Sequence, residues 1–335
     1  MEHVLADEES LQTIAFGSCV DQDHPQPIWA AINAESPDLF IFLGDNIYGD
    51  TEDMDVMRGK YQKLASNPGF AELRENTPAI AIWDDHDFGE DNAGVEYPMK
   101  EESRQIMLDF WAEPTDSVRR MRDDGIYTAY QYGPGGRRVQ IILLDLRWNR
   151  TSLQKVNLGH YNPGRIAKDM GPYVAIEDSD AVLLGEKQWR WLEAQLGEPA
   201  DIRIIGSSIQ LLPEFSGWES WANFPKERQR FLSLLRKLET EGVFIISGDT
   251  HWSELSRVEN TLDYSLWEIT SSGLTEEWKK VSPNIHRVGN PYAEANYGLI
   301  EIDWGGDEPS ITLSIKDVSG TTKMRQQIVL TDLKK

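Results

Sequence analysis

The sequence predicts an α/β fold in which two mixed β-sheets pack face to face with helices outside, an αββα sandwich. Apolar runs of strand length alternate with helical patterns up to about residue 251, and strand-like runs then follow one another directly. Alternation indicates parallel strands joined by helices, whereas consecutive runs indicate antiparallel strands. No linker or internal repeat divides the chain. We therefore expect one domain, residues 1–335, with a flexible N-terminus over residues 1–12.

The first part of the chain predicts three strands with helices between them. The strands are the apolar runs Thr13–Phe16, Leu39–Leu43 and Pro78–Trp83. Helices are expected over 27–34, 53–66 and 100–112. In the last of these, Met107, Phe110 and Trp111 recur at i, i+3 and i+4, the spacing of one helix face.

The second part begins with two neighbouring strands, Ile126–Tyr132 and Val139–Leu144, separated by a turn sequence of glycine and proline. An irregular stretch over 148–182 follows, and loops of that length in a compact domain are usually functional. The remaining pattern predicts a helix, a strand, a second helix and five strands: Lys187–Leu196, Ile202–Ile205, 225–241, Val243–Ile246, Leu266–Thr270, Tyr297–Asp303, Ile311–Ile315 and Gln326–Leu330.

The charge balance is strongly acidic, with 33 basic and 56 acidic residues and a formal net charge of −23. Such a chain repels nucleic acid and anionic membranes and attracts metal cations. No apolar run approaches the ~20 residues that span a bilayer. The first residues show no signal-peptide pattern, and the single cysteine, Cys19, excludes an intramolecular disulfide.

Polar groups that suit metal ions or phosphate follow five of the predicted strands. Ligands in open α/β sheets bind beyond the carboxyl ends of strands, so strands sharing one sheet edge would bring these groups together. Carboxylates, imidazole, phenolate and thiolate can hold two cations ~4 Å apart, as in two-metal phosphoesterases. An arginine can bind phosphoryl oxygens through two parallel hydrogen bonds. The groups are Cys19, Asp45 with Tyr48, Asp84-Asp85-His86, Asp145 with Arg147, and Asp249 with His251.

Taken singly, the same residues have simpler interpretations. A lone cysteine after a strand is usually a small buried apolar residue, and Asp84–Asp87 could be a solvated acidic loop. Arg147 could be a surface ion-pair partner. Trp218 and Trp221 either line a cleft for an organic leaving group or pack at its rim. The order and spacing of all the groups favour the metal-binding interpretation.

The motif series resembles that of calcineurin-like metallophosphoesterases, and among them most closely the alkaline phosphatase D (PhoD-type) family. The resemblance extends from about residue 13 to 255. Its motifs, in order, are Gly17-Ser18-Cys19, Gly44-Asp45-Asn46-Ile47-Tyr48, Trp83-Asp84-Asp85-His86-Asp87, Leu144-Asp145-Leu146-Arg147 and Gly248-Asp249-Thr250-His251.

The resemblance implies a dinuclear metal centre. Fe(III) would be bound by Cys19, Tyr48 and His251, and a divalent cation by Asp85 and Asp249. Asp45 would bridge the two ions. Calcium is the expected second metal, with Mg, Mn and Zn as alternatives. Asp85 is preferred over Asp84, which would instead orient a neighbouring group.

The resemblance also implies roles around the substrate. His86 would be a general acid or a hydrogen-bond donor to phosphate, and Arg147 would bind phosphate while Asp145 orients it. Ser208 would contact the substrate. One departure from the superfamily pattern concerns a metal-binding histidine after a further strand. This chain has Ser208 or Gln210 there.

The implied activity is that of a dinuclear metal-dependent phosphoesterase, acting on monoesters, diesters or both by means of a metal-bridging hydroxide. The substrate would be a small-molecule or lipid-headgroup phosphoester. The departure at Ser208 leaves an alternative, a metal- or phosphate-binding scaffold with weakened catalysis. Family members are usually exported to the periplasm or the outside of the cell, whereas this chain shows no signal peptide.

Overall fold

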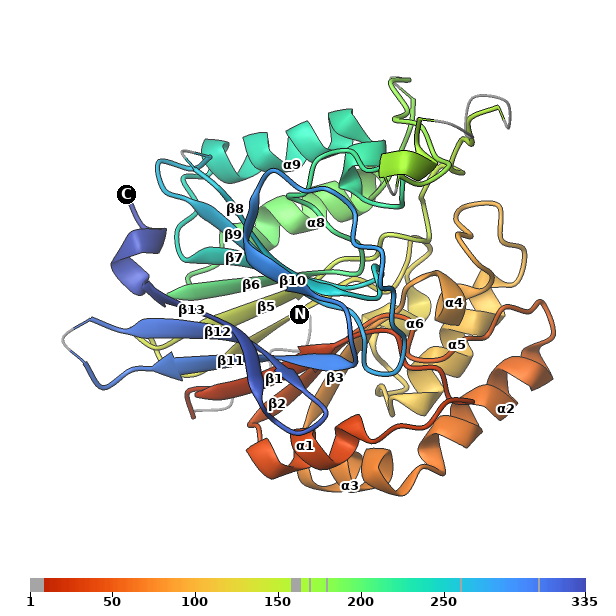
Figure 1. The fold of residues 1–335 in the computed structure, drawn as a ribbon, viewed down its shortest axis with the longest axis horizontal. Coiled ribbons are helices and arrows are strands. Elements are labelled where there is room, and N and C mark those ends of the chain that lie inside the picture. Colours follow the sequence, from red (N-terminus) through yellow and green to blue (C-terminus); the bar gives the residue numbers. More distant parts are fainter. Residues whose placement is uncertain (1–8, 158–163, 169, 179, 260, 307) are drawn as a thin grey trace.

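The computed structural model describes residues 9–157, 164–168, 170–178, 180–259, 261–306 and 308–335. Two mixed sheets lie face to face with helices on both outer surfaces, which confirms the predicted αββα sandwich (Figure 1). Helices α1 (Ile28–Glu35), α2 (Met54–Ala65) and α3 (Pro68–Asn76) lie beside one sheet, and α8 (Glu186–Leu196) and α9 (Pro225–Lys237) lie beside the other.

One sheet has six strands in the order β13-β12-β11-β1-β2-β3. Its strands β1, β2 and β3 are parallel, while β11, β12 and β13 pair antiparallel with their neighbours. The bounds are β1 Thr13–Gly17, β2 Leu39–Leu43, β3 Ala79–Ile82, β11 Asn296–Asp303, β12 Ser310–Asp317 and β13 Thr322–Val329.

The other sheet has seven strands in the order β10-β8-β9-β7-β6-β5-β4. Strands β5, β6, β7 and β9 are parallel, and β4, β8 and β10 pair antiparallel at the two sides. The bounds are β4 Thr128–Tyr132, β5 Val139–Leu143, β6 Ile202–Ser207, β7 Val243–Ser247, β8 Ser253–Val258, β9 Leu266–Ser271 and β10 Arg287–Tyr292.

Local sequence explains where these elements begin and why they are buried. All five residues of β2 are buried, as expected for a parallel strand covered on both faces. Helix α2 begins after Asp53, whose carboxylate accepts a hydrogen bond from the Asp55 amide at 2.9 Å. Helix α3 begins with Pro68 after Asn67, whose side chain accepts from the Gly69 amide at 3.0 Å.

The predicted strands are present, and the structure adds elements that the sequence patterns did not predict. These are α3, α4 (Asp85–Phe88), α6 (Val118–Met121), β8 and β10. Helix α5 (Lys100–Phe110) and the 3-10 helices η2 (Trp221–Asn223) and η3 (Leu330–Leu333) complete the ordered elements outside 148–182. Within the described part of 148–182, the only helix is η1, Ile166–Lys168.

Residues 1–8 of the expected flexible N-terminus lie outside the described residues. The rest of that segment is packed, because Leu11 is buried and the Gln12 amide donates to Asp38 at 2.8 Å. No helix in the described ranges is long and apolar enough to cross a membrane.

The two sheets meet where their parallel strands end. An isolated bridge joins Ser18, directly after β1, to Ser272, directly after β9. The loops that follow β1, β2 and β3 therefore face the loops that follow β7 and β9. Residues from both sheets can converge at this junction.

Candidate metal centre

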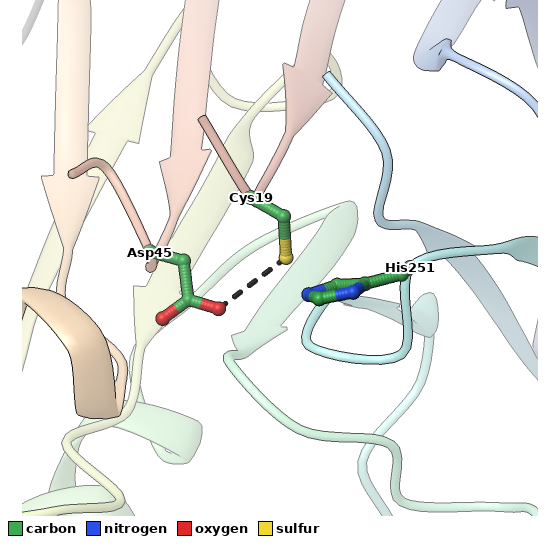
Figure 2. Close-up of side chains that lie close together, drawn as sticks. All are labelled: Cys19, Asp45 and His251. Carbon is green, nitrogen blue, oxygen red and sulfur yellow. Dashed lines mark hydrogen bonds between the residues drawn. The ribbon is translucent and has the colours of Figure 1, made fainter. Parts of the chain in front are cut away.

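The first group of ligand-type atoms comes from both sheets. Cys19 follows β1, Asp45 follows β2 and His251 follows β7, and one ligand atom from each lies within 4.8 Å of the others. Figure 2 shows the three side chains pointing toward one another. The Cys19 thiol donates to Asp45 Oδ2 at 3.3 Å. A thiol, a carboxylate and an imidazole so placed can share one cation.

Tyr48 adjoins this group. Its Oη lies 2.9 Å from His251 Nε2. Burial raises the pKa of Tyr48 well above its usual value, with further contributions from Cys19 and Asp45. A phenol in such a site ionises only when a cation compensates the negative charge.

The second group consists of four carboxylates, Asp45, Asp84, Asp85 and Asp249, whose oxygens also lie within 4.8 Å of one another. Asp45 belongs to both groups. Among the described residues, Asp84 Oδ2 is buried and has no hydrogen-bond partner, and Asp85 Oδ1 is buried with only an ion-pair contact of 3.4 Å to Arg147. Buried carboxylate oxygens are normally paired, so these two fit ligation of a cation, and an all-oxygen set suits a hard ion such as Ca²⁺.

Burial, together with the charges of neighbouring groups, shifts the pKa values of the cluster. Burial, followed by the charges of Cys19 and Asp85, raises the pKa of Asp45 well above its usual value. Burial raises the pKa of the Cys19 thiol to about 12 and that of Asp84 to about 6. Burial also lowers the pKa of His251 to about 4. Cation binding to such a cluster is expected to displace protons.

Four of the predicted ligands sit in the left-handed region of the backbone. Their φ angles are 65° at Cys19, 48° at Asp45, 70° at Asp249 and 60° at His251. Residues other than glycine rarely adopt this conformation, and such strain is concentrated at functional sites. Each strand therefore turns sharply as it ends, at the residues whose side chains form the two groups.

His86 lies beside the second group, at the start of α4. Its backbone amide donates to Asp45 Oδ1 at 3.3 Å, and its Nδ1 lies 2.6 Å from Asp50 Oδ1. Burial would lower the pKa of His86, but the carboxylates of Asp85, Asp45 and Asp50 outweigh it and raise that pKa to about 11. Asp50 was not predicted from the sequence, although it lies only two residues after Tyr48.

Arg147 is completely buried, and its guanidinium contacts carboxylates. It pairs with Asp84 through Nε, with Glu219 at 2.8 Å and with Asp85 at 3.4 Å. It is not among the described residues that line the cleft above the cluster. Three carboxylates contact the guanidinium in this arrangement, and a contact of Arg147 with phosphate stays a prediction.

Asp145 was expected to orient the Arg147 side chain, but it contacts main-chain groups instead. Its carboxylate accepts from the amides of Ile126 at 2.8 Å, Arg147 at 2.9 Å and Trp148 at 3.0 Å. Asp145 thus fixes the loop after β5. The guanidinium is positioned by Glu219, which the sequence analysis missed because no strand pattern precedes it.

Ser208 and Gln210, the candidates for the missing histidine, both use their side chains as hydrogen-bond donors to other residues. Ser208 Oγ donates to Asp84 Oδ1 at 2.6 Å and is fully buried beneath the cluster. The substrate contact of Ser208 stays a prediction, and the hydrogen bond shows that Ser208 contacts a member of the second group. Gln210 donates to Glu254 and Thr270. Asp84 instead stands beside Asp85 in the second group.

Ser272 is a further residue that the sequence analysis did not single out. Its Oγ lies 3.1 Å from Cys19 Sγ and accepts a hydrogen bond from the His251 amide at 2.8 Å. It therefore links the ligands that come from the two sheets. The available signal was a hydroxyl directly after a predicted strand, which is weaker than a carboxylate or an imidazole in the same place.

An open cleft of about 230 Å³ lies above the two groups. Side chains of the two ligand groups form its floor, and His86 and Asp91 also line it. Tyr173, Trp218, Trp252 and Trp278 supply aromatic surface. Trp218 thus lines the cleft, whereas Trp221 is fully buried and its indole donates to Ser207 Oγ at 3.0 Å.

The fold and the site together define a metallophosphoesterase-like protein, an αββα sandwich with cation-binding groups at its strand ends. The family model of PhoD-like phosphatases matches residues 14–297. The chain belongs to this family, and the resemblance seen in its motifs is confirmed.

A curated relative is alkaline phosphatase D of Bacillus subtilis (strain 168), which is 22% identical over 289 residues. The match covers 73% of this chain and 47% of the relative. The chain thus spans about half the length of the curated relative that it matches.

Two solved structures show the same fold. One is described as the structure of PhoD, with a TM-score of 0.74 and 16% identity, covering 98% of this chain and 70% of that one. The other is GAP50, the anchor in the inner membrane complex of Plasmodium, with a TM-score of 0.59 and 12% identity, covering 96% and 90%.

Proposed function

We propose that this protein is a metal-dependent phosphoesterase with a dinuclear centre, acting on monoesters, diesters or both. The observation that carries the proposal is the position of Asp45, which belongs to both groups of ligand-type atoms and can bridge two cations. Membership of the PhoD-like phosphatase family supports the same reaction class.

The donor sets support two different ions. Cys19, Tyr48 and His251, with Asp45, provide sulfur, phenol and imidazole donors, which suit Fe(III). Asp45, Asp84, Asp85 and Asp249 provide only carboxylates, which suit Ca²⁺, with Mg²⁺, Mn²⁺ or Zn²⁺ as alternatives. Both Asp84 and Asp85 are assigned to this second site, since both belong to the four-carboxylate group and Asp84 Oδ2 is buried without a hydrogen-bond partner in the described chain.

The surrounding residues have distinct tasks in this proposal. Two bound cations would supply positive charge to the phosphoryl oxygens and activate water for in-line attack. His86, with Nδ1 held by Asp50 at 2.6 Å, would present Nε2 to the cleft and donate a proton to the leaving oxygen. Arg147 would balance the charge of Asp84 and Asp85 and hold both in place.

The substrate in this proposal is a small-molecule or lipid-headgroup phosphoester, which an open cleft lined by the ligand groups can admit. The family resemblance also supports function outside the cytoplasm. A second candidate function is a binding scaffold without turnover. It is favoured by the composition of the second group, whose four members are all aspartates; the His86 imidazole lies within 4.8 Å of two of them, Asp45 and Asp85.

Turnover measurements test the proposal. Protein loaded with iron and calcium is given p-nitrophenyl phosphate and bis(p-nitrophenyl) phosphate, and its metal content is measured in parallel. We expect hydrolysis of at least one ester. Asp45→Asn should lose metal from both sites and at least a hundredfold in kcat/KM, because both cations share this carboxylate.

Asp91→Asn is the matched control, because Asp91 lines the same cleft but belongs to neither ligand group. It should retain the metal content of the unmodified protein. Metal-loaded protein without turnover would support the scaffold, and an Asp45→Asn variant with full metal and full activity would refute the bridging role.

A further inference from the structure

Two tryptophans, Trp218 and Trp278, form an aromatic wall beside the side chains of the two ligand groups. Trp218 and Trp278 line the cleft, and their rings meet edge to face with centroids 5.8 Å apart. Trp278 keeps 43% of its surface exposed. Burial of a large aromatic side chain is favourable, so one that stays exposed at the mouth of a cleft indicates a surface that binds a ligand.

A backbone hydrogen bond and a sequence neighbour hold the two tryptophans beside the candidate metal centre. The Trp278 amide donates to the carbonyl of His251, a candidate iron ligand, at 2.9 Å. Trp218 directly precedes Glu219, whose carboxylate binds Arg147 at 2.8 Å. Each tryptophan is therefore one residue or one hydrogen bond away from the residues that build the centre.

The segment 171–173 supports the wall from its other side. The Gly171 amide donates to the Ser216 carbonyl at 3.1 Å, and the Tyr173 amide donates to the Gly217 carbonyl at 2.9 Å. These bonds fix the loop that carries Trp218 and place the Tyr173 ring in the cleft lining. An aromatic surface fixed before binding loses little conformational entropy when a ligand stacks on it.

The charge of the cleft restricts what can lie against this wall. Among the described lining residues none is lysine or arginine, whereas Asp91 adds a carboxylate to those of the ligand groups. Glu219 also lines the cleft, but its charge is balanced by Arg147 and Arg150. The cations would neutralise the phosphoryl group but not a second anion farther out. An organic group that carries its own negative charge would meet these carboxylates.

We propose that Trp218 and Trp278 form a subsite for the organic part of the substrate, which is an uncharged ring. The inference rests on the proposed phosphoesterase function and names its substrate class, phosphoesters of uncharged aromatic groups. The ring stacks on the indoles while the phosphoryl group lies over the candidate metal centre. Trp218 and Trp278 would thus determine specificity without taking part in proton transfer or metal binding.

Binding of two phosphonates that cannot be hydrolysed tests the subsite. Phenylphosphonate and methylphosphonate carry the same charged group and differ in the organic group. Titration calorimetry on the metal-loaded protein should give about tenfold tighter binding of phenylphosphonate, the lower range for stacking on an aromatic side chain. 4-Carboxyphenylphosphonate should bind more weakly than phenylphosphonate, because the described lining residues offer carboxylates and no lysine or arginine to its second negative charge.

Variants then assign the effect to the wall. Trp278→Ala should reduce the ratio of the two affinities to about twofold, and Trp278→Phe should restore most of it, because a phenyl ring still offers a stacking face. Ile285→Ala is the matched control, since Ile285 lies in the same loop, is 74% exposed and does not line the cleft. It should leave the ratio unchanged.

The ratio of the two phosphonate affinities distinguishes loss of the subsite from damage to the metal centre. Damage to the centre weakens both phosphonates together, whereas loss of stacking lowers only their ratio. Equal binding of phenyl- and methylphosphonate, or an unchanged ratio in both Trp278→Ala and Trp218→Ala, would overturn the inference even in an active enzyme. Preferential binding of phenylphosphonate without turnover would instead retain the subsite and reject the phosphoesterase proposal.

Discussion

Tyr48 and Tyr61 provide a direct comparison of two buried phenols near the candidate centre. Tyr48 Oη lies 2.9 Å from His251 Nε2, whereas Tyr61 Oη donates to Asp87 at 3.4 Å and belongs to neither ligand group. Tyr48→Phe should abolish the visible phenolate-to-iron absorption of the iron-loaded protein, because the substitution removes the donor oxygen. Absorption spectra at matched iron content measure this.

Tyr61→Phe is the control and should leave the visible band intact. Burial raises the pKa of Tyr61 well above its usual value, as it does for Tyr48, so the two variants differ mainly in their distance from the candidate iron ligands. A visible band that survives in Tyr48→Phe would exclude Tyr48 as an iron ligand.

Some residues of the candidate site could be predicted from the sequence, and others could not. Asp45, Cys19 and His251 could be predicted, because each follows an apolar strand and has a side chain that binds metals. Glu219 could not, since its role depends on its ion pair with Arg147 across 72 positions of the chain. The partners of Arg147 were unpredictable for the same reason. An arginine suits phosphate and carboxylate equally well, and tertiary packing decides between them.

The turn after β2 depends on Gly44. Its φ angle is 104°, and a Cβ atom built there would lie 2.4 Å from Cβ of Asp84. Gly44→Ala should therefore lower the free energy of unfolding by about 2 kcal/mol or more through backbone strain alone. It should also weaken calcium binding, because Asp84 must move. Denaturant unfolding and calcium titration measure the two effects.

Gly59→Ala in α2 is the matched control, because an added Cβ there meets no atom within 4 Å. An alanine in the middle of a helix should stabilise the protein by about 0.5–1 kcal/mol without changing calcium affinity. Similar stability changes of the same sign in both variants would contradict the role given to the Gly44 turn.

The raised pKa of Glu268 in β9 should make the free energy of unfolding depend on pH. Burial raises its pKa from 4.5 to about 6, although it accepts hydrogen bonds from the amides of Leu211 and Leu212. The unfolded chain therefore ionises first as pH rises. Stability falls between about pH 4.5 and 6, by about 2 kcal/mol in total, and the loss is complete above that range.

Comparison with Glu268→Gln isolates this effect, because glutamine does not ionise. The unfolding free energy of the unmodified protein, relative to that of Glu268→Gln, should fall by about 2 kcal/mol between pH 4 and pH 7. Glu301→Gln on the exposed face of β11 should show no such change in difference. A constant difference across the pH range for Glu268→Gln would contradict the raised pKa.

The strands that form the centre were the most predictable elements, because buried parallel strands are continuous apolar runs. Strand β10 was not predictable, since Arg287–Tyr292 contains Gly289 and Pro291, which weaken a strand pattern. Helix α3 was missed although its signals, Asn67 before Pro68, were present. The short helix α4 begins at a local cap, in which the Asp87 carboxylate accepts a hydrogen bond from the Asp84 amide at 2.7 Å, and its four residues are too few to show a helical apolar pattern.

The molecule as a whole should lose stability when metal is removed. Cys19, Asp45, Asp84 and Asp85 follow strands of one sheet, and Asp249 and His251 follow a strand of the other. Bound cations would therefore hold the two sheets together, and each would add about 2.7 kcal/mol at a hundredfold excess over its Kd. Chelation should lower Tm by several degrees, as calorimetry can measure.

The Asp45→Asn variant serves as the control for chelation, because it should contain little metal from the start. Its Tm should change little on addition of a chelator. An equal fall of Tm in both proteins would show that the chelator acts elsewhere, and no change in the unmodified protein would contradict a structural contribution of the metals.

The junction of Ser18 with Ser272 has a consequence for spectroscopy. Cys19 adjoins one side of this bridge and His251 hydrogen-bonds to the other, so the distance between two candidate iron ligands depends on how the sheets sit against each other. The absorption of an iron–thiolate pair varies with the length of its bond. The colour of the iron-loaded protein would therefore report on small movements between the two layers, including those caused by substitutions far from the cleft.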